Sequence, residues 1–225
     1  MGISTSKGLV LHKSCYSNTS LIITALTPDH GILRMMGRGY RRPPKRSSTL
    51  REPIELFSEM EFGVYWSSSS DLHNATASAS MESFSELRSS VDRFCAAGFG
   101  ASLALSVSGG SSPSEYANLR NFWRALCAGL PVATSLLKFW LKHLSIAGFL
   151  PSLDRCGECG GPFEGGTWFG EGEESLLCPS CGSGRTLAGP MPGDLKSAAH
   201  LVREPYMDTK LRLNPGTRRS LARFL

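Results

Sequence analysis

Four cysteines arranged as two hooks constrain this chain more than any other feature. The hooks are Cys156-Gly-Glu-Cys159 and Cys178-Pro-Ser-Cys181, and eighteen residues lie between them. Each C-x2-C turn presents two sulfurs from one tight loop, so two turns supply the four thiolates of a tetrahedral metal ion. The spacing is typical of structural zinc sites. We therefore predict a structural Zn²⁺ ion held by Cys156, Cys159, Cys178 and Cys181.

Two alternatives to structural zinc have less support in the sequence. Disulfides require an oxidising compartment, and the first residues, Met1-Gly-Ile-Ser-Thr-Ser-Lys7, contain no apolar run typical of a signal peptide. Catalytic zinc requires an open coordination position, which four cysteines do not leave. A zinc deaminase also needs H-x-E ahead of P-C-x-x-C, and none of the five histidines has glutamate two residues later.

The size and composition favour a folded, soluble protein. The chain has 225 residues, of which 41% are apolar and 19% are charged, so it can bury sizeable cores. No apolar stretch approaches the roughly 20 residues that span a bilayer. We expect a cytoplasmic protein with two domains, 1–80 and 81–225, because the residue pattern changes near residue 81.

The basic charge is concentrated in one segment without acidic residues. Its glycines and prolines, in Gly37-Arg-Gly-Tyr40 and Pro43-Pro44, disfavour a helix and favour an exposed loop. Guanidinium groups on such a loop can follow a phosphate backbone, although a merely solvated loop explains the charge equally well. The candidate DNA-binding residues are Arg34, Arg38, Arg41, Arg42, Lys45 and Arg46. A second basic run, around Arg218 and Arg219, fits a solvated helix face better.

The first 80 residues have the pattern of a small β-barrel. Apolar runs at 8–11, 21–26 and 32–36 are separated by turn signals, and the segment 53–62 alternates before its phase shifts at Phe57, which suggests a bulge. About five short strands, with a charged loop between the third and fourth, favour a barrel of the oligonucleotide-binding (OB) type.

After Met81 the period becomes helical. Residues 81–95 carry an apolar stripe that predicts one buried helix. A capping box at 112–115 opens a second helix, whose apolar positions include Trp123, and a third helix is expected from about 131 to 147. Shorter helices are expected over 194–203 and 215–224. The fold is thus predicted as α+β, with an OB barrel followed by a helical domain that carries a four-cysteine zinc knuckle.

Several motifs together resemble a known family. They are Lys7-Gly-Leu-Val-Leu11, Thr27-Pro-Asp-His-Gly31, Arg38-Gly-Tyr-Arg-Arg42, Gly148-Phe-Leu-Pro151 and both cysteine hooks. They occur in the order found in the bacterial recombination mediator family RecO, and they cover most of the chain. The resemblance implies an OB barrel and a helical domain with a zinc knuckle held by the four cysteines. It also implies that the basic loop of the barrel binds DNA through Arg38, Arg41, Arg42, Lys45 and Arg46.

The resemblance also implies a function in DNA repair. Proteins of this family bind single- and double-stranded DNA, anneal complementary strands, and act with RecR and RecF. They help to load RecA onto DNA covered by single-strand-binding protein, whose C-terminal tail is an expected partner. A non-enzymatic DNA-binding mediator is therefore the leading hypothesis.

Two other functions remain open at this stage. One is a zinc-ribbon and OB-fold module that binds RNA or a protein. The other is a metal-dependent nuclease or hydrolase, although the sequence lacks a tight constellation of Asp, Glu and His and an open metal position. No G-x-x-x-x-G-K-[ST] motif is present, so a nucleotide-driven motor is not expected.

Overall fold

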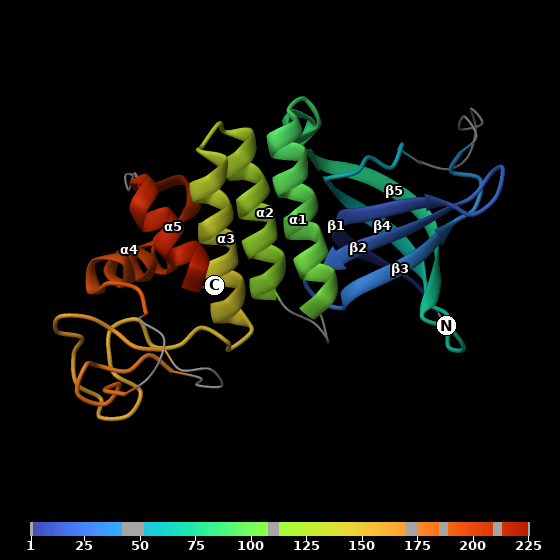
Figure 1. The fold of residues 1–225 in the computed structure, drawn as a ribbon. Coiled ribbons are helices and arrows are strands. Elements are labelled where there is room, and N and C mark those ends of the chain that lie inside the picture. Colours follow the sequence, from blue (N-terminus) through green and yellow to red (C-terminus); the bar gives the residue numbers. More distant parts are fainter. Residues whose placement is uncertain are drawn as a thin grey trace. The chain divides into compact units, whose positions relative to one another are not determined.

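In the part of the chain that the structure describes, five strands are followed by a series of helices. The computed structural model describes residues 2–41, 52–107, 113–169, 175–184, 189–208 and 213–224. The elements are β1 (Ile3–Cys15), β2 (Leu21–Thr27), β3 (Gly31–Gly37), β4 (Ser58–Tyr65), β5 (Leu72–Ser83), the 3₁₀ turn η1 (Ser85–Arg88), α1 (Val91–Val107), α2 (Pro113–Cys127), α3 (Val132–Ile146), α4 (Pro192–Arg203), η2 (Tyr206–Asp208) and α5 (Pro215–Phe224) (Figure 1).

These elements form two compact units, 1–132 and 133–225, each of which is described by itself. The domain boundary expected near residue 81 stays a prediction. Within the described part of the chain, we find no helix that combines the length and apolar character needed to cross a membrane.

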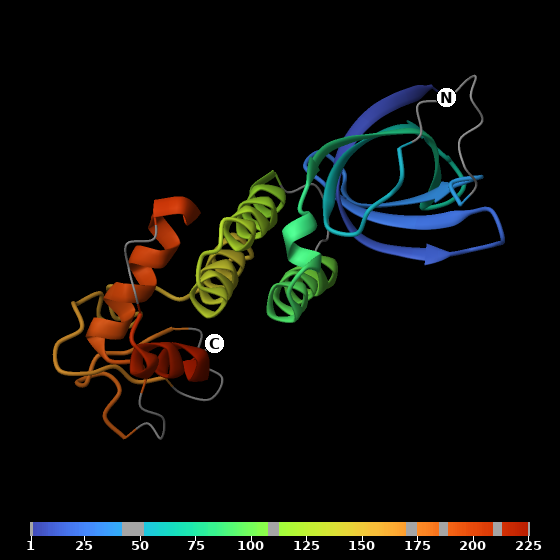
Figure 2. The same ribbon diagram turned by 90° about the horizontal axis from the view of Figure 1, so that it is seen from above.

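The five strands close into a barrel with the order β1-β2-β3-β5-β4. Figure 2 shows them curving into a ring. Strand β1 is long enough to pair with β2 through its second half and with β4 through its first half. The pairs are antiparallel except that of β3 with β5, which is parallel and brings Arg34 opposite Leu72. This is the OB-like ring that the sequence predicts.

Alternating side chains fill the barrel. In β4 the side chains of Met60, Phe62 and Val64 are buried in the barrel core, where they pack with Ile23 and Ala25 of β2. Burying one such apolar side chain contributes about 1.5–3 kcal/mol relative to exposure. The alternation of buried and exposed side chains therefore fixes the register of β4, because a slip by one residue would turn all of these apolar side chains outward.

The predicted change of phase at Phe57 is a real distortion, but the strand begins later than expected. Residues 53–57 precede β4, and Phe57 has a left-handed backbone with φ 57°. The register of β4 with β5 also shifts between Glu59 and Met60. As a result Phe57 contacts the rings of Phe94 and Trp123, each at 5.3 Å between ring centroids. The left-handed turn at Phe57, just before β4, thus places one aromatic ring against α1 and α2.

A buried ion pair also joins the barrel to α2. Glu59 of β4 is 1% exposed, accepts a hydrogen bond from the Tyr116 hydroxyl, and lies 2.6 Å from Arg120 Nε. Arg120 and Arg124 both contact Glu82 of β5, at 3.2 and 2.6 Å. These carboxylates are thereby neutralised where the barrel meets α2.

The single helix predicted for the stripe over residues 81–95 is wrong. Met81 lies in β5, Leu87 lies in η1, and α1 begins only at Val91. Val91 is 78% exposed and Phe94 is 43% exposed, so this part of the stripe is not buried either. Residues up to 83 form a strand instead of a helix because they pair with β4, and such tertiary hydrogen bonds override a local helical pattern. Helix α2, in contrast, buries Trp123 completely, as its pattern predicts.

The second unit has a core between α3 and the last two helices. Leu141 of α3 clusters with Leu201 of α4 and Leu221 of α5. Lys138 of α3 is also fully buried, and its ammonium group donates a hydrogen bond of 2.7 Å to the carbonyl of Pro205. Burial of an amine is costly unless it has such a partner. The predicted helices at 194–203 and 215–224 correspond to α4 and α5.

Candidate metal centre and nucleic-acid interface

The two cysteine hooks meet in space. The sulfur atoms of Cys156, Cys159, Cys178 and Cys181 all lie within 4.8 Å of one another, and those of Cys159 and Cys178 are 3.8 Å apart. Four thiolates at about 2.3 Å from a tetrahedral zinc ion would be about 3.8 Å apart. The sulfur cluster therefore has the dimensions of a tetrathiolate metal site, and the donor set suits zinc.

Both hooks are built by the same backbone turn. The N–H of Gly160 donates to the carbonyl of Cys156 at 2.9 Å, and the N–H of Gly182 donates to the carbonyl of Cys178 at 2.8 Å. Glycine is favoured at position 160 because the φ of +69° is a left-handed conformation that residues with a side chain rarely adopt. Each turn brings a second sulfur back beside the first, which explains why cysteines three positions apart can bind one ion.

The hooks are held together by a small apolar cluster and by backbone pairing. Trp168 and Leu177 exchange two hydrogen bonds of 2.9 Å, and Phe163 packs against the buried hook residues Cys156 and Cys178. At Gly182, an added Cβ would lie 2.5 Å from Trp168, so glycine is required there for space. The cluster is small, and bound metal would therefore supply much of the folding energy of this segment.

The backbone around the hooks stabilises thiolates. The N–H of Cys159 lowers the pKa of Cys156 to about 6, and the N–H of Cys178 donates to the same sulfur at 3.3 Å. Similarly, the N–H of Cys181 lowers the pKa of Cys178. Hydrogen bonding with the Cys178 sulfur, together with burial, raises the pKa of Cys181 to about 12. With no cation among them the four sulfurs cannot all ionise easily, whereas a divalent cation would favour the fully deprotonated set.

The described part of the basic segment begins on the barrel wall. Arg34 is exposed in β3, where it pairs with Thr24 of β2 on one side and Leu72 of β5 on the other. Arg38 and Arg41 are exposed in the turn that follows β3. Arg34 thus lies within the strand, whereas Arg38 and Arg41 lie in the turn just beyond its end. Arg42, Lys45 and Arg46 lie outside the described residues.

The turn after β3 is fastened to the barrel. The ring of Tyr40 packs against the barrel core and fills the space at Gly37, where an added Cβ would lie 2.8 Å from it. Arg41 donates from Nη1 to the carbonyl of Ser17 at 2.7 Å, and its backbone N–H donates to the carbonyl of Thr19 at 3.1 Å. The start of the basic segment is therefore tied to the loop between β1 and β2.

Sequence analysis did not identify the β1–β2 loop as part of this region. Ser17 and Thr19 contribute only backbone carbonyls to Arg41, so no side-chain pattern could have revealed them. The adjacent Tyr16 is 63% exposed, which places an aromatic ring at the start of the same loop. Trp123 is a fully buried core residue, as its helical spacing predicts.

Two family models match the chain, one over the barrel and one over the helices that follow it. Residues 1–84 match the family model "Recombination protein O N terminal", and residues 88–225 match "Recombination protein O C terminal". The chain is 34% identical over 185 residues to a "DNA repair protein RecO" from Anaeromyxobacter sp. (strain K), covering 80% of this chain and 72% of that protein.

Relatives from other bacteria carry the same name. The chain is 32% identical over 192 residues to the protein from Rubrobacter xylanophilus, covering 81% of this chain and 73% of that protein. It is 29% identical over 218 residues to the protein from Roseiflexus sp. (strain RS-1), covering 95% of this chain and 75% of that one. Similarity therefore extends across both the barrel and the metal-site region.

Proposed function

The chain belongs to the RecO family of DNA repair and recombination proteins, and from this premise we propose that it binds and anneals single-stranded DNA. The observation that carries the proposal is an exposed cationic surface on the OB-like barrel, formed by Arg34 of β3 and by Arg38 and Arg41 of the turn that follows it. Arginine side chains pair with phosphate oxygens through a planar fork of donors. The acid-free segment continues through Arg42, Lys45 and Arg46.

Annealing requires no catalytic group. Two strands repel each other through their phosphates, and a cationic surface lowers that repulsion by replacing the condensed counterions. Arg34 is exposed on β3 between the partly exposed Ile32 and Met36, and Tyr16 is exposed in the neighbouring β1–β2 loop. Cationic contacts to phosphates leave the bases of the bound strand free to pair with a second strand.

Further activities follow from family membership alone. We propose that the protein also binds double-stranded DNA and acts with RecR and RecF to help load RecA onto DNA coated by single-strand-binding protein. The C-terminal tail of that protein is a proposed partner. The proposed role is that of a mediator rather than an enzyme.

The four-cysteine cluster is proposed to hold a structural Zn²⁺ ion. All four positions of a tetrahedral ion would be occupied by Cys156, Cys159, Cys178 and Cys181, which leaves none for a substrate. When bound, the ion would neutralise the thiolates and close the knuckle. Elemental analysis of protein purified without chelator should find about one zinc per chain, and Cys178→Ser should lower both zinc content and stability of the second unit. Four freely titratable thiols in metal-free, fully folded protein would contradict this proposal.

The DNA site can be tested by salt titration. We expect Arg41→Ala, Arg42→Ala and Arg46→Ala, combined, to weaken binding to a labelled single-stranded oligonucleotide for every sequence. The slope of log affinity against log salt should become shallower by about 2 units, since each lost phosphate contact removes about 0.7 on single strands. Annealing of two complementary oligonucleotides should slow in parallel.

A matched variant separates this loop from basic charge in general. Arg218→Ala with Arg219→Ala removes cations from α5 and should leave the salt slope nearly unchanged. If instead the α5 variant loses affinity and the loop variant does not, the loop assignment is wrong. An RNA oligonucleotide that binds more tightly than DNA of the same sequence would favour the RNA-binding alternative over a DNA repair role.

A further inference from the structure

Three aromatic rings gather on the barrel near the start of β3, whereas the cationic turn follows the end of that strand. Trp66 comes directly after β4, and its ring centroid lies 4.6 Å from that of His30 and 4.7 Å from that of His73. His30 precedes β3, and His73 is the second residue of β5. We call these three residues the ring cluster. Three segments that are distant in the sequence thus build one aromatic surface beside β3.

Hydrogen bonds hold two of the three rings in place. The indole N–H of Trp66 donates to the hydroxyl of Ser4 at 2.6 Å, and the backbone N–H of Ser67 donates to Nδ1 of His73 at 3.1 Å. Trp66 also packs against the barrel core. Rings that are already fixed lose little conformational freedom when another planar group stacks on them, so the ring cluster is preorganised for such a ligand.

The ring cluster is open to solvent. His30 is exposed, while Trp66 and His73 are half-buried. The imidazole of His30 is therefore the ring that a ligand meets first. The turn that carries it is held by the backbone, because the N–H of His30 donates to Thr27 Oγ1 at 3.1 Å. The side chain of His30 can thus be replaced without removing this hydrogen bond.

The charge around the ring cluster favours a neutral planar group over a phosphate. The segments that supply the rings, 27–33 and 65–75, contain Asp29 and Asp71 but no lysine or arginine. Both carboxylates are exposed, and they would repel a phosphate placed directly on the rings. A nucleobase is uncharged, and every base has a π-face that stacks on aromatic side chains. The ligand that fits this surface is therefore an unpaired base.

The ring cluster adjoins the proposed DNA surface. Arg34 is the fourth residue of β3 and lies about 10 Å along the strand from its first residue, which follows His30. On the neighbouring strand β5, Leu72 pairs with Arg34, and His73 pairs with Met35. A single strand whose phosphates contact Arg34 can therefore turn one of its bases onto the rings.

We propose that the ring cluster stacks one unpaired base of a strand whose phosphates are held by Arg34, and that this contact favours single-stranded over double-stranded DNA. A base inside a duplex must be unpaired and unstacked before it can reach the rings. The other bases of the bound strand stay free to pair, so the contact is compatible with annealing. The proposal rests on the proposed function, because the cationic surface must first hold the strand.

Binding to single-stranded DNA tests the stacking contact. His30→Ala removes the exposed ring and should weaken binding to a labelled oligonucleotide about tenfold, with an unchanged melting temperature. His30→Phe restores a ring without imidazole nitrogens and should bind within about twofold of the wild type. The matched control, His200→Ala, removes an exposed histidine of α4 and should have no effect. Equal losses in the two His30 variants, or no loss in His30→Ala, would overturn the proposal.

Salt and duplex measurements separate stacking from charge. Because a stacked base releases no counterion, His30→Ala should lower the log affinity equally at every salt concentration and leave the slope unchanged. The titration is run at pH 8, above the range in which imidazole ordinarily titrates. Binding to a duplex of the same sequence should match the wild type, and an equal loss on the duplex would refute the proposed strand preference. Failure of the wild-type chain to bind single strands would instead refute the proposed function itself.

Photocrosslinking locates the stacked base. Oligonucleotides that carry 5-iodouracil at each position in turn are bound to the wild-type chain, irradiated, and analysed by mass spectrometry. At least one position should crosslink to His30 or Trp66. Crosslinks confined to Tyr16 or Tyr40, the aromatic residues beside the cationic turn, would place the base at the other end of β3 and overturn the assignment.

Discussion

Replacement of Arg120 by methionine would leave the buried carboxylate of Glu59 without its cation. Arg120 Nε lies 2.6 Å from a Glu59 side chain that is only 2% exposed, while the Arg120 side chain is 30% exposed. Breaking a buried ion pair from one side costs about 3–5 kcal/mol. Water that reaches the outer part of Arg120 lowers this figure, and the Tyr116 hydroxyl still donates to the carboxylate. We therefore expect Arg120→Met to destabilise the first unit by about 2–3 kcal/mol.

The matched control is Arg124→Met, one helical turn further along α2. Arg124 pairs at 2.6 Å with Glu82, but both side chains are partly exposed, at 41% and 28%. Exposed pairs contribute about 0–1 kcal/mol, and Arg120 remains near Glu82. The two variants thus remove the same charge from the same helix and differ chiefly in the burial of the carboxylate partner.

Urea unfolding measures the free-energy change, and hydrogen exchange of the α2 amides separates the first unit from the second. Glu59→Gln in the Arg120→Met background should recover part of the lost stability, because the uncompensated charge is removed. Equal destabilisation by Arg120→Met and Arg124→Met, within about 0.5 kcal/mol, would refute the argument that burial of Glu59 determines the cost.

Three further results are expected. Burial raises the pKa of Tyr116 above its ordinary value, so the buried, protonated phenol stabilises the fold below about pH 10 and this stabilisation is lost as the pH rises further. Tyr116→Phe should therefore reduce the decline of the unfolding free energy at alkaline pH, and an unchanged decline would contradict this. Gly182→Ala should clash with Trp168 and speed zinc loss to a chelator, whereas zinc loss at the wild-type rate would show that Trp168 moves freely. Gly37→Ala should displace Tyr40 and weaken DNA binding while changing the melting temperature little. A lowered melting temperature with unchanged DNA binding would give the contact a purely structural role.

The four-cysteine cluster was predictable from sequence because it depends on short local spacing. Two C-x2-C turns present sulfur pairs wherever they fold, and the fold brings the four sulfur atoms together. The filling of the barrel was also predictable in outline, since the alternation of Met60, Phe62 and Val64 directly reflects the two faces of a strand. The buried stripe of α2 follows from the same argument with a helical period.

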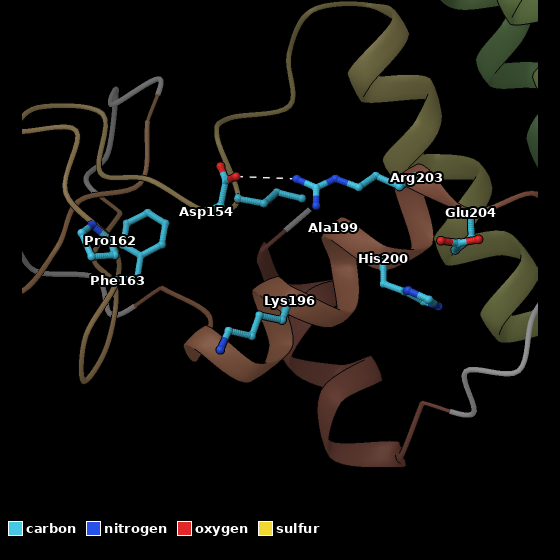
Figure 3. A pocket seen from close by; sticks show the side chains of 9 residues that line it. Asp154, Pro162, Phe163, Lys196, Ala199, His200, Arg203 and Glu204 are labelled. Carbon is cyan, nitrogen blue, oxygen red and sulfur yellow. Dashed lines mark ion pairs between the residues drawn. The ribbon is translucent and has the colours of Figure 1, made fainter.

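Features that depend on contacts between distant segments were decided only by the tertiary structure. Pairing with β4 extends β5 through Met81, where the local period is helical, and the backbone carbonyl of Ser17 holds Arg41 without any side-chain signature. A pocket of about 520 Å³ beside α4 likewise combines Phe163 with Lys196, which are far apart in the chain (Figure 3). Local patterns determine which face of an element is apolar. The partner that covers this face depends on the closure of the chain, because long-range hydrogen bonds and packing can outweigh a propensity difference of about 1 kcal/mol or less per residue.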